Sequence, residues 1–122
     1  RILPVASVQN RLSPYARESI ALAQECARRG ILFLAYSPLG GSRLAKKLHE
    51  LPQFRQIAEA RGVSVQQVVL AWVRAQAATV VPIPGARTVE HAVDSARAAD
   101  FVLSEQESFL LYPSREGNLT RN

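Results

Sequence analysis

Hydrophobic residues in this chain alternate between short continuous runs and longer stretches with helical spacing. Three of the continuous runs are rich in the Val, Ile, Leu and Phe side chains that β-strands favour. They predict a strand of about five residues ending near Gln9, a strand over 31–36 and a short strand within 79–85. The second run, ILFLAY, has no polar alternation, which is typical of a parallel strand covered on both faces.

The stretches with helical spacing are bounded by start and stop signals. Ser13 followed by Pro14 predicts the start of a helix that runs to Arg29, just before Gly30. Five further segments have helical features: a loop or short helical turn over 42–50, helices over 54–61, 65–76 and 88–99, and a short last helix after Ser104.

Two of these helices begin with the spacing of a capping box, in which a Ser side chain and a Glu or Gln side chain three residues later satisfy free backbone donors. The pairs are Ser64 with Gln67 and Ser104 with Glu107. Thr88 supplies a simpler cap for the helix that follows it. The residues after Tyr112 follow neither pattern, and we expect them to be irregular.

Strands and helices therefore alternate along the chain, which favours a parallel sheet with right-handed crossovers. A length of 122 residues is the size of one domain. We accordingly expect a single α/β domain over residues 1–122, with about three parallel strands and flanking helices.

Composition excludes several classes of protein. A hydrophobic fraction of 48% and a charged fraction of 20% are ordinary for a globular domain, and no apolar run approaches the roughly 18 residues of a membrane span. With Cys26 as its single cysteine, the chain has no intrachain disulfide and no paired-cysteine zinc site, so we expect no metal and a reducing, cytoplasmic setting. Because it starts at Arg1 and contains no methionine, we expect it to be a piece of a longer protein.

The net charge of +5 comes mainly from arginine, which accounts for 13 of the 15 basic residues. The planar guanidinium suits phosphate groups better than the point charge of lysine does, so an anionic partner is one interpretation. The other is that these arginines solubilise helix faces, since they are spread along the chain.

Candidate binding residues follow each predicted strand, where loops of α/β proteins collect ligands. The first strand ends at Gln9, the second at Tyr36 and Ser37 before a Gly-Gly pair, and the third at Gly85, Ala86 and Arg87, just before a helix. An amide, an aromatic face and backbone N–H groups freed by small residues would together suit a flat ring carrying phosphates. Each residue alone is more often a core, turn or solvated position, so the hypothesis depends on their coincidence.

Three motifs resemble one known family. The strings VQN, AYSPLG and VVPIPGARTVEHAVDSARAADFVLSEQE occur in the order found in the carboxyl-terminal part of aldo-keto reductases, which are TIM-barrel oxidoreductases that use NADPH. The resemblance covers essentially the whole chain. It implies a partial (β/α)8 TIM barrel, with strands that match the sixth to the eighth of the family.

The resemblance also implies roles for individual residues. In the family, the residue matching Gln9 binds the nicotinamide amide and the one matching Tyr36 stacks on the nicotinamide ring. Further positions contact the rest of the NADPH molecule: Ser37, Leu39 and Gly40 the pyrophosphate, Gly85, Ala86 and Arg87 the 2′-phosphate, and His91, Asp94 and Ser95 the adenosine end. The chain departs from the family at His91, where arginine or glutamine is common, and at Ser95, where asparagine is common.

The catalytic tyrosine, lysine, aspartate and histidine of the family have no match in this chain. Carbonyl reduction needs an acid that protonates the oxygen as hydride arrives. The available phenols and imidazoles have no evident partner that would lower the pKa of such an acid: Tyr15, Tyr36, Tyr112, His49 and His91. We therefore predict that the isolated chain is inactive and name no catalytic residue.

Three parallel strands leave two unpaired edges and an apolar face, both of which favour association. We expect the chain to pair with itself or with a complementary barrel fragment, and not with a membrane. Two alternatives to the reductase interpretation stay open. One is a non-catalytic relic or assembly subunit that keeps the nucleotide half of the site.

The other alternative is a helix-turn-helix in the segment FRQIAEARGVSVQQVVLAWVRAQ, a form typical of DNA-binding modules. Its second helix carries apolar residues on most sides, which leaves little polar surface to contact bases. We therefore expect no nucleic-acid partner.

Overall fold

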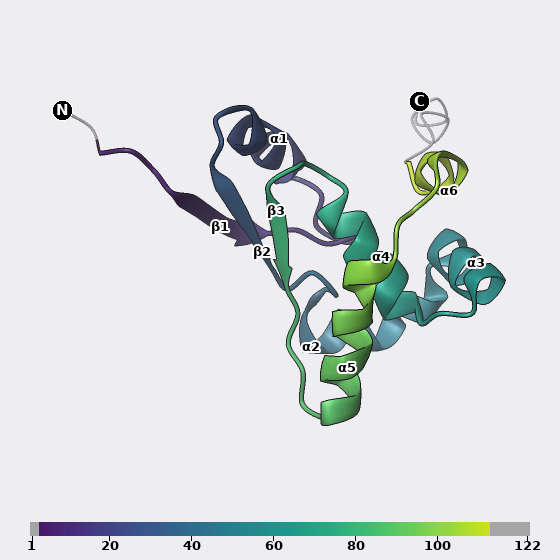
Figure 1. Cartoon of the computed structure of the whole chain (residues 1–122). Helices are drawn as coiled ribbons and strands as arrows, with labels where there is room; N and C mark the ends of the chain where they lie inside the picture. Colours follow the sequence, from purple (N-terminus) through teal and green to yellow (C-terminus); the bar gives the residue numbers. More distant parts are fainter. Residues whose placement is uncertain (1–2, 113–122) are drawn as a thin grey trace, which may run out of the picture.

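The computed structural model describes residues 3–112, in which strands and helices alternate (Figure 1). The strands are β1 (Ser7–Arg11), β2 (Leu32–Tyr36) and β3 (Val80–Ile83). The α-helices are α1 (Ile20–Arg28), α2 (Gly41–Leu44), α3 (Pro52–Arg61), α4 (Val65–Arg74), α5 (Val89–Arg97) and α6 (Glu105–Leu110). Two 3-10 helices complete the described part: η1 (Ala45–Glu50) and η2 (Ala98–Asp100).

The strands form one sheet in the order β1-β2-β3, and both pairings are parallel. Gln9 lies beside Leu34 and Arg11 beside Tyr36, while Tyr36 lies beside Ile83 on its other side. The predicted parallel sheet with three strands and flanking helices is thus confirmed. Because the strands point the same way, their carboxyl ends and the loops that follow them lie at one edge of the sheet.

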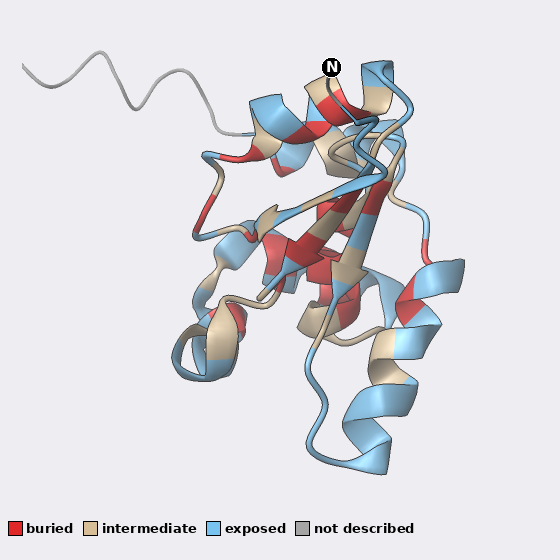
Figure 2. Ribbon diagram, turned by 90° about the vertical axis from the view of Figure 1, so that its left-hand side faces the viewer, coloured by how far each residue is buried: buried red, intermediate tan, exposed pale blue. Residues whose placement is uncertain are grey.

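Within residues 3–112, helices cover only one face of this sheet. Phe33 and Ala35 of β2 are fully buried, whereas Leu32 and Tyr36 on the opposite face are 48% and 40% exposed. Figure 2 shows the sheet in front, with the helices packed behind it. The expectation that β2 is covered on both faces was therefore wrong for this chain, because three strands form an open sheet and do not close into a barrel.

The hydrophobic core lies between the covered face of the sheet and α4, the most buried helix. Seven consecutive residues of α4, from Gln67 to Val73, are buried. The Trp72 ring packs edge-on against Phe54, with ring centroids 5.9 Å apart, and the Arg17 guanidinium lies over its face at 4.8 Å. Burial of large side chains such as Phe33 and Trp72 contributes about 1.5–3 kcal/mol each, so this layer accounts for much of the stability.

The first predicted helix begins later than expected. Ser13 and Ala16 exchange two backbone hydrogen bonds of 3.1 and 3.0 Å, and the Ser13 hydroxyl accepts from the backbone N–H of Tyr15. These bonds close a turn where the sequence indicated a helix start, and α1 begins only at Ile20. The strand before it also extends past its predicted end at Gln9, since Asn10 and Arg11 stay paired with β2.

The remaining helices lie close to their predicted positions. The segment 42–50 is helical throughout, as α2 and η1, while α3 begins at Pro52 and α5 ends at Arg97, where η2 continues the turn. The predicted Thr88 cap is present, because its hydroxyl accepts from the backbone N–H of His91. The predicted irregular segment after Tyr112 lies outside the described residues.

The two predicted capping boxes have different outcomes. The Ser104–Glu107 box is complete, with both reciprocal hydrogen bonds present. At the other helix the Ser64 hydroxyl accepts from the backbone N–H of Gln67, but the Gln67 side chain donates to Asp94 instead of returning to Ser64. That box is therefore only half formed, because the Gln67 side chain makes its hydrogen bond to Asp94 of α5.

Candidate functional site

A groove opens at the carboxyl ends of β2 and β3, at the place predicted for ligand binding. Its volume is about 1540 Å³, and its walls come from the β2–α2 loop with α2 and η1 on one side and the β3–α5 loop with α5 on the other. Ser37 and Leu39 line the first wall, and Arg87 and His91 line the second. The sheet order thus brings together residues 50 positions apart in the sequence.

The first wall is a tight turn with an unusual backbone. Ser37, Gly40 and Gly41 have positive φ angles of 48°, 94° and 81°, and the Gly40 N–H donates to the Ser37 carbonyl at 2.9 Å. A positive φ is common for glycine but costs other residues energy, and such residues concentrate at functional sites. Ser37 therefore holds an unfavourable conformation at the edge of the groove.

Tyr15 and Leu44 support this turn from behind. A Cβ built on Gly40 would lie 2.7 Å from the Leu44 Cβ and 2.8 Å from the Tyr15 Cδ2, so the two side chains pack directly on the glycine backbone. By contrast, a Cβ on Gly41 would meet no heavy atom within 4 Å. Gly40 thus faces the protein, whereas Gly41 lines the groove.

Positive charge dominates the groove. Two of its acidic side chains, Glu90 and Asp94, both lie on α5. The basic side chains come from both walls and outnumber them: Arg43, Lys46, Lys47, Arg87 and Arg97. The groove is therefore electrostatically suited to an anionic ligand, and its arginines can donate paired hydrogen bonds to phosphate oxygens.

The uncovered face of the sheet adjoins this groove. Gln9 and Tyr36 lie on that face on adjacent strands, offset by two residues because Gln9 pairs with Leu34. Ile83, which pairs with Tyr36, also lines the groove and so connects the two surfaces. A ligand that extends from the groove over Ile83 would reach the exposed Tyr36 ring.

The structure gathers most of the predicted nucleotide-binding residues. Eight of them line the groove together: Ser37, Leu39, Gly85, Ala86, Arg87, His91, Asp94 and Ser95. Gln9 and Tyr36 lie on the neighbouring sheet face, and Gly40 supports the turn without lining the groove. The carboxylate of Asp94 is already engaged, since it accepts hydrogen bonds from Ser64 and Gln67 at 2.7 Å each.

Several residues of this region were missed in the sequence. The cations Arg43, Lys46 and Lys47 lie in the segment 42–50, which was predicted as a loop or short helical turn and not as part of the site, although a basic cluster just after a Gly-Gly turn is a usable signal. Arg11 lies beside Tyr36 on the open face, and no local pattern indicated it. Tyr15 supports Gly40 across 25 positions, a contact that depends on the turn at Ser13.

The described groove residues include cations, His91 and two carboxylates, but no tyrosine. Tyr15, a phenol that packs on Gly40 of the turn, has its pKa raised from the usual 10.0, first by burial and then by the negative charge of Glu50. A raised pKa makes a phenol a weaker acid, which is opposite to what protonation of a carbonyl oxygen requires. Tyr15 therefore suits support of the turn better than acid catalysis.

Within residues 3–112, no cluster of three or more His, Cys, Asp or Glu side chains able to hold a metal ion occurs. No helix in this part of the chain has both the length and the hydropathy to cross a membrane.

Comparison with known proteins connects this geometry to a family. Residues 1–110 match the family model described as "Aldo/keto reductase family". An uncharacterized oxidoreductase of Schizosaccharomyces pombe is 31% identical over 103 residues, covering 84% of this chain and 33% of that protein. A methylglyoxal reductase of Escherichia coli is 34% identical over 96 residues, covering 75% of this chain and 34% of that protein.

Solved structures agree. An aldo/keto reductase from Klebsiella pneumoniae, in complex with NADP and acetate, is similar with a TM-score of 0.78 and 33% identity, covering 90% of this chain and 41% of that one. The chain thus spans about a third of the length of the curated relatives named above. A family match over residues 1–110, with three parallel strands and flanking helices arranged as in part of the TIM barrel, shows that this chain belongs to the aldo/keto reductase family.

Proposed function

We propose that this chain supplies the cofactor-binding side of an aldo/keto reductase site that carries out NADPH-dependent carbonyl reduction. One observation carries the proposal: eight residues expected at the nucleotide line a single cationic groove at the carboxyl ends of β2 and β3. The aldo/keto reductase of Klebsiella pneumoniae described as a complex with NADP supports it at the level of the family.

The residues present fit a phosphorylated nucleotide. Arg87 precedes α5 and offers a planar pair of donors to a 2′-phosphate, while Arg43 and Lys46 extend the positive surface toward a pyrophosphate. Gly41 and Gly85 leave open space where a side chain would project, so a ligand can approach their backbone closely. The donor chemistry and the open backbone together match the anionic part of NADPH.

At the other end, Tyr36 and Gln9 would hold the nicotinamide. The exposed Tyr36 ring offers a flat apolar surface for stacking, and the Gln9 amide can both donate to and accept from a carboxamide. When bound, NADPH supplies the hydride that is transferred to a carbonyl carbon. Tyr36, by covering one ring face, would leave the other face toward the substrate.

The acid that protonates the carbonyl oxygen has to come from residues outside this groove. The groove itself offers no phenol in its described lining, and the pKa of Tyr15 is raised. We therefore propose that the open face of the sheet is completed by further barrel strands, in a complementary fragment or a longer chain, or by a second copy. Those elements would contribute the acid and the substrate pocket.

A second candidate function is nucleotide binding without turnover, as in a relic or an assembly subunit. Because the described groove residues include no tyrosine, nucleotide binding without turnover is the function favoured for the chain on its own. The helix-turn-helix alternative has less support, because residues 67–73 of α4 are buried in the core. A buried helix cannot enter a DNA groove.

The proposal is tested by calorimetric titration of NADPH and NADH into the full chain. We expect NADPH to bind more tightly, because the 2′-phosphate gains charge-assisted hydrogen bonds from Arg87. Arg87→Gln should weaken NADPH binding roughly tenfold or more while changing NADH binding little. Arg28→Gln, on α1 and paired with Glu25, removes the same charge away from the groove and serves as the matched control.

Each outcome has a defined meaning. Equal weakening by Arg87→Gln and Arg28→Gln would show that only net charge matters, which contradicts a 2′-phosphate site at Arg87. No binding of either nucleotide at millimolar concentration would overturn the proposal for this chain. Binding without reduction of an aldehyde, followed by activity once a complementary barrel half is added, would establish the cofactor-side role.

A further inference from the structure

The α5 helix forms one wall of the groove, yet it is weakly attached to the rest of the protein. None of its residues is buried, and Figure 2 shows it in the colours of exposed and intermediate residues. Val89 and Val93, two of its apolar side chains, are 82% and 44% exposed. Little hydrophobic burial therefore holds α5 in place, and a different interaction has to determine its position.

That interaction is made by Asp94. Its Oδ2 accepts from the Ser64 hydroxyl and its Oδ1 from the Gln67 side-chain amide, each at 2.7 Å. In the described part of the chain these are the only side-chain hydrogen bonds from α5 to another helix or strand. Arg74, whose guanidinium donates to the Ala99 and Phe101 carbonyls, fixes the segment that follows α5.

The partners of Asp94 belong to α4, the most buried helix of the described residues. Ser64 and Gln67 are the N-cap and third residue of α4, and Gln67 is only 7% exposed. The partial positive charge at the start of a helix favours a carboxylate there, so the α4 N-terminus strengthens both hydrogen bonds. Without Asp94, the buried Gln67 amide would lose its acceptor, which is costly.

Because its two oxygens accept from Ser64 and Gln67, the Asp94 carboxylate is held against the start of α4, although the residue also lines the groove. The cations that Asp94 helps to place are nearby on the same wall: Arg87, just before α5, and Arg97 at its end. We propose that Asp94 is a positioning residue, which acts on the nucleotide by fixing α5 to α4 and not by contacting the adenosine.

This inference rests on the proposed nucleotide site, and a double-mutant cycle tests it. Asp94→Ala removes the acceptor, and Gln67→Met removes one donor from a residue that does not line the groove. We expect each variant to weaken NADPH binding roughly tenfold, with the double variant no weaker than Asp94→Ala, because Asp94→Ala already removes the hydrogen bond that Gln67→Met removes. Gln56→Met, at an exposed position of α3, is the matched control.

Amide hydrogen exchange of α5 provides a readout that needs no nucleotide. Faster exchange over residues 89–97 in both Asp94→Ala and Gln67→Met, with a far-UV spectrum like that of the wild type, would support the proposal. If Gln67→Met changes neither affinity nor exchange while Asp94→Ala weakens binding, Asp94 contacts the ligand directly and the proposal is overturned.

The exchange measurement also separates the two proposals. If the wild-type chain binds no NADPH, the proposed function fails, but exchange of α5 still decides whether Asp94 fixes the helix. Unchanged exchange in both variants would refute the positioning role whatever the titration shows.

Discussion

Gly40 meets two separate requirements at the centre of the β2–α2 turn. Its φ of 94° is a conformation that other residues adopt only at a cost, and its Cα is enclosed by Leu44 and Tyr15. Gly41, with φ of 81°, shares the first requirement but not the second. The two neighbours therefore form a natural pair for separating backbone strain from steric contact.

We predict that Gly40→Ala destabilises the chain more than Gly41→Ala. Both variants incur about 1–2 kcal/mol for a left-handed non-glycine residue. Gly40→Ala adds about 1–3 kcal/mol, because its Cβ overlaps Leu44 and Tyr15. The free energies of unfolding in urea measure the difference, and equal losses for the two variants would contradict the packing of Tyr15 on this turn.

The raised pKa of Tyr15 predicts that the stability of the chain depends on pH in the alkaline range. Burial, and then the charge of Glu50, raises the pKa of Tyr15 in the folded chain above its usual 10.0. Above pH 10 the unfolded chain loses the phenol proton first, so stability falls as the pH rises through the folded pKa. Tyr15→Phe should remove this part of the decline between pH 9 and 11, measured as melting temperature. An identical decline in both proteins would argue against the shift.

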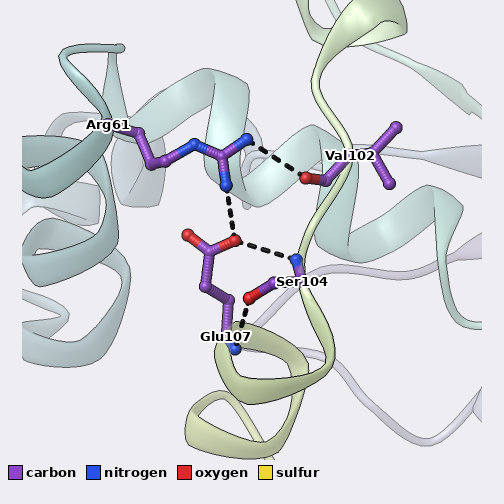
Figure 3. A network of polar contacts seen from close by, with 4 residues as sticks. All are labelled: Arg61, Val102, Ser104 and Glu107. Carbon is purple, nitrogen blue, oxygen red and sulfur yellow. Dashed lines mark hydrogen bonds and ion pairs between the residues drawn. The ribbon is translucent and has the colours of Figure 1, made fainter.

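At the scale of whole elements, α6 depends on a small polar network between distant segments. The Arg61 guanidinium of α3 donates to Glu107 at 2.7 Å and to the Val102 carbonyl at 3.3 Å (Figure 3). It also lies over the Phe101 ring. The same Glu107 oxygen accepts from the Ser104 backbone N–H. Glu107 therefore serves both the local cap and the tertiary ion pair.

Two substitutions at Glu107 separate these roles. Glu107→Gln keeps an oxygen for the Ser104 N–H but loses the charge, and should cost about 0.5 kcal/mol because the Arg61 side chain is partly exposed. Glu107→Ala also loses the acceptor of the Ser104 backbone N–H, which is the reciprocal half of the capping box, and should cost about 1–2 kcal/mol. Thermal denaturation with exposed Glu105→Ala as the control provides the measurement. Equal losses at Glu107 would mean that this reciprocal hydrogen bond contributes nothing.

For the whole molecule, the open face of the sheet is the main consequence of having three strands. Leu32, Tyr36, Val81 and Ile83 expose 40–48% of their surface on one apolar face. Water solvates such a face poorly, and β1 and β3 also have unpaired edges. The expected pairing with a second copy or a complementary fragment therefore stays a prediction with a clear physical cause.

We predict that Val81→Lys reduces self-association of the chain without unfolding it. A charge on the open face of the sheet makes burial of that face by a partner unfavourable. Val102→Lys adds the same charge at a position that is 70% exposed outside the sheet, and should leave association unchanged. Sedimentation velocity over a range of concentrations measures the effect. A wild-type chain that remains monomeric at high concentration would contradict the prediction.

Local signals in the sequence predicted the helices and strands well where a single residue or a short run marks the start or end of an element. Gly62 ends α3 in a left-handed conformation, Thr88 and Ser104 cap α5 and α6, and apolar runs mark β2 and β3. The predicted start of α1 was wrong because the Ser13 side chain stabilises a local turn. A serine in such a turn has nearly the same sequence signal as a serine that caps a helix.

The sequence alone determined the family, the order of elements and most of the residues around the groove, because each depends on local patterns or on motifs of contiguous residues. Only the tertiary structure decided which contacts those residues make. Asp94 turns to α4, Tyr15 packs on Gly40, and one sheet face stays uncovered. Such contacts join positions far apart in the chain, and their geometry follows from how helices pack on the sheet, which no local pattern encodes.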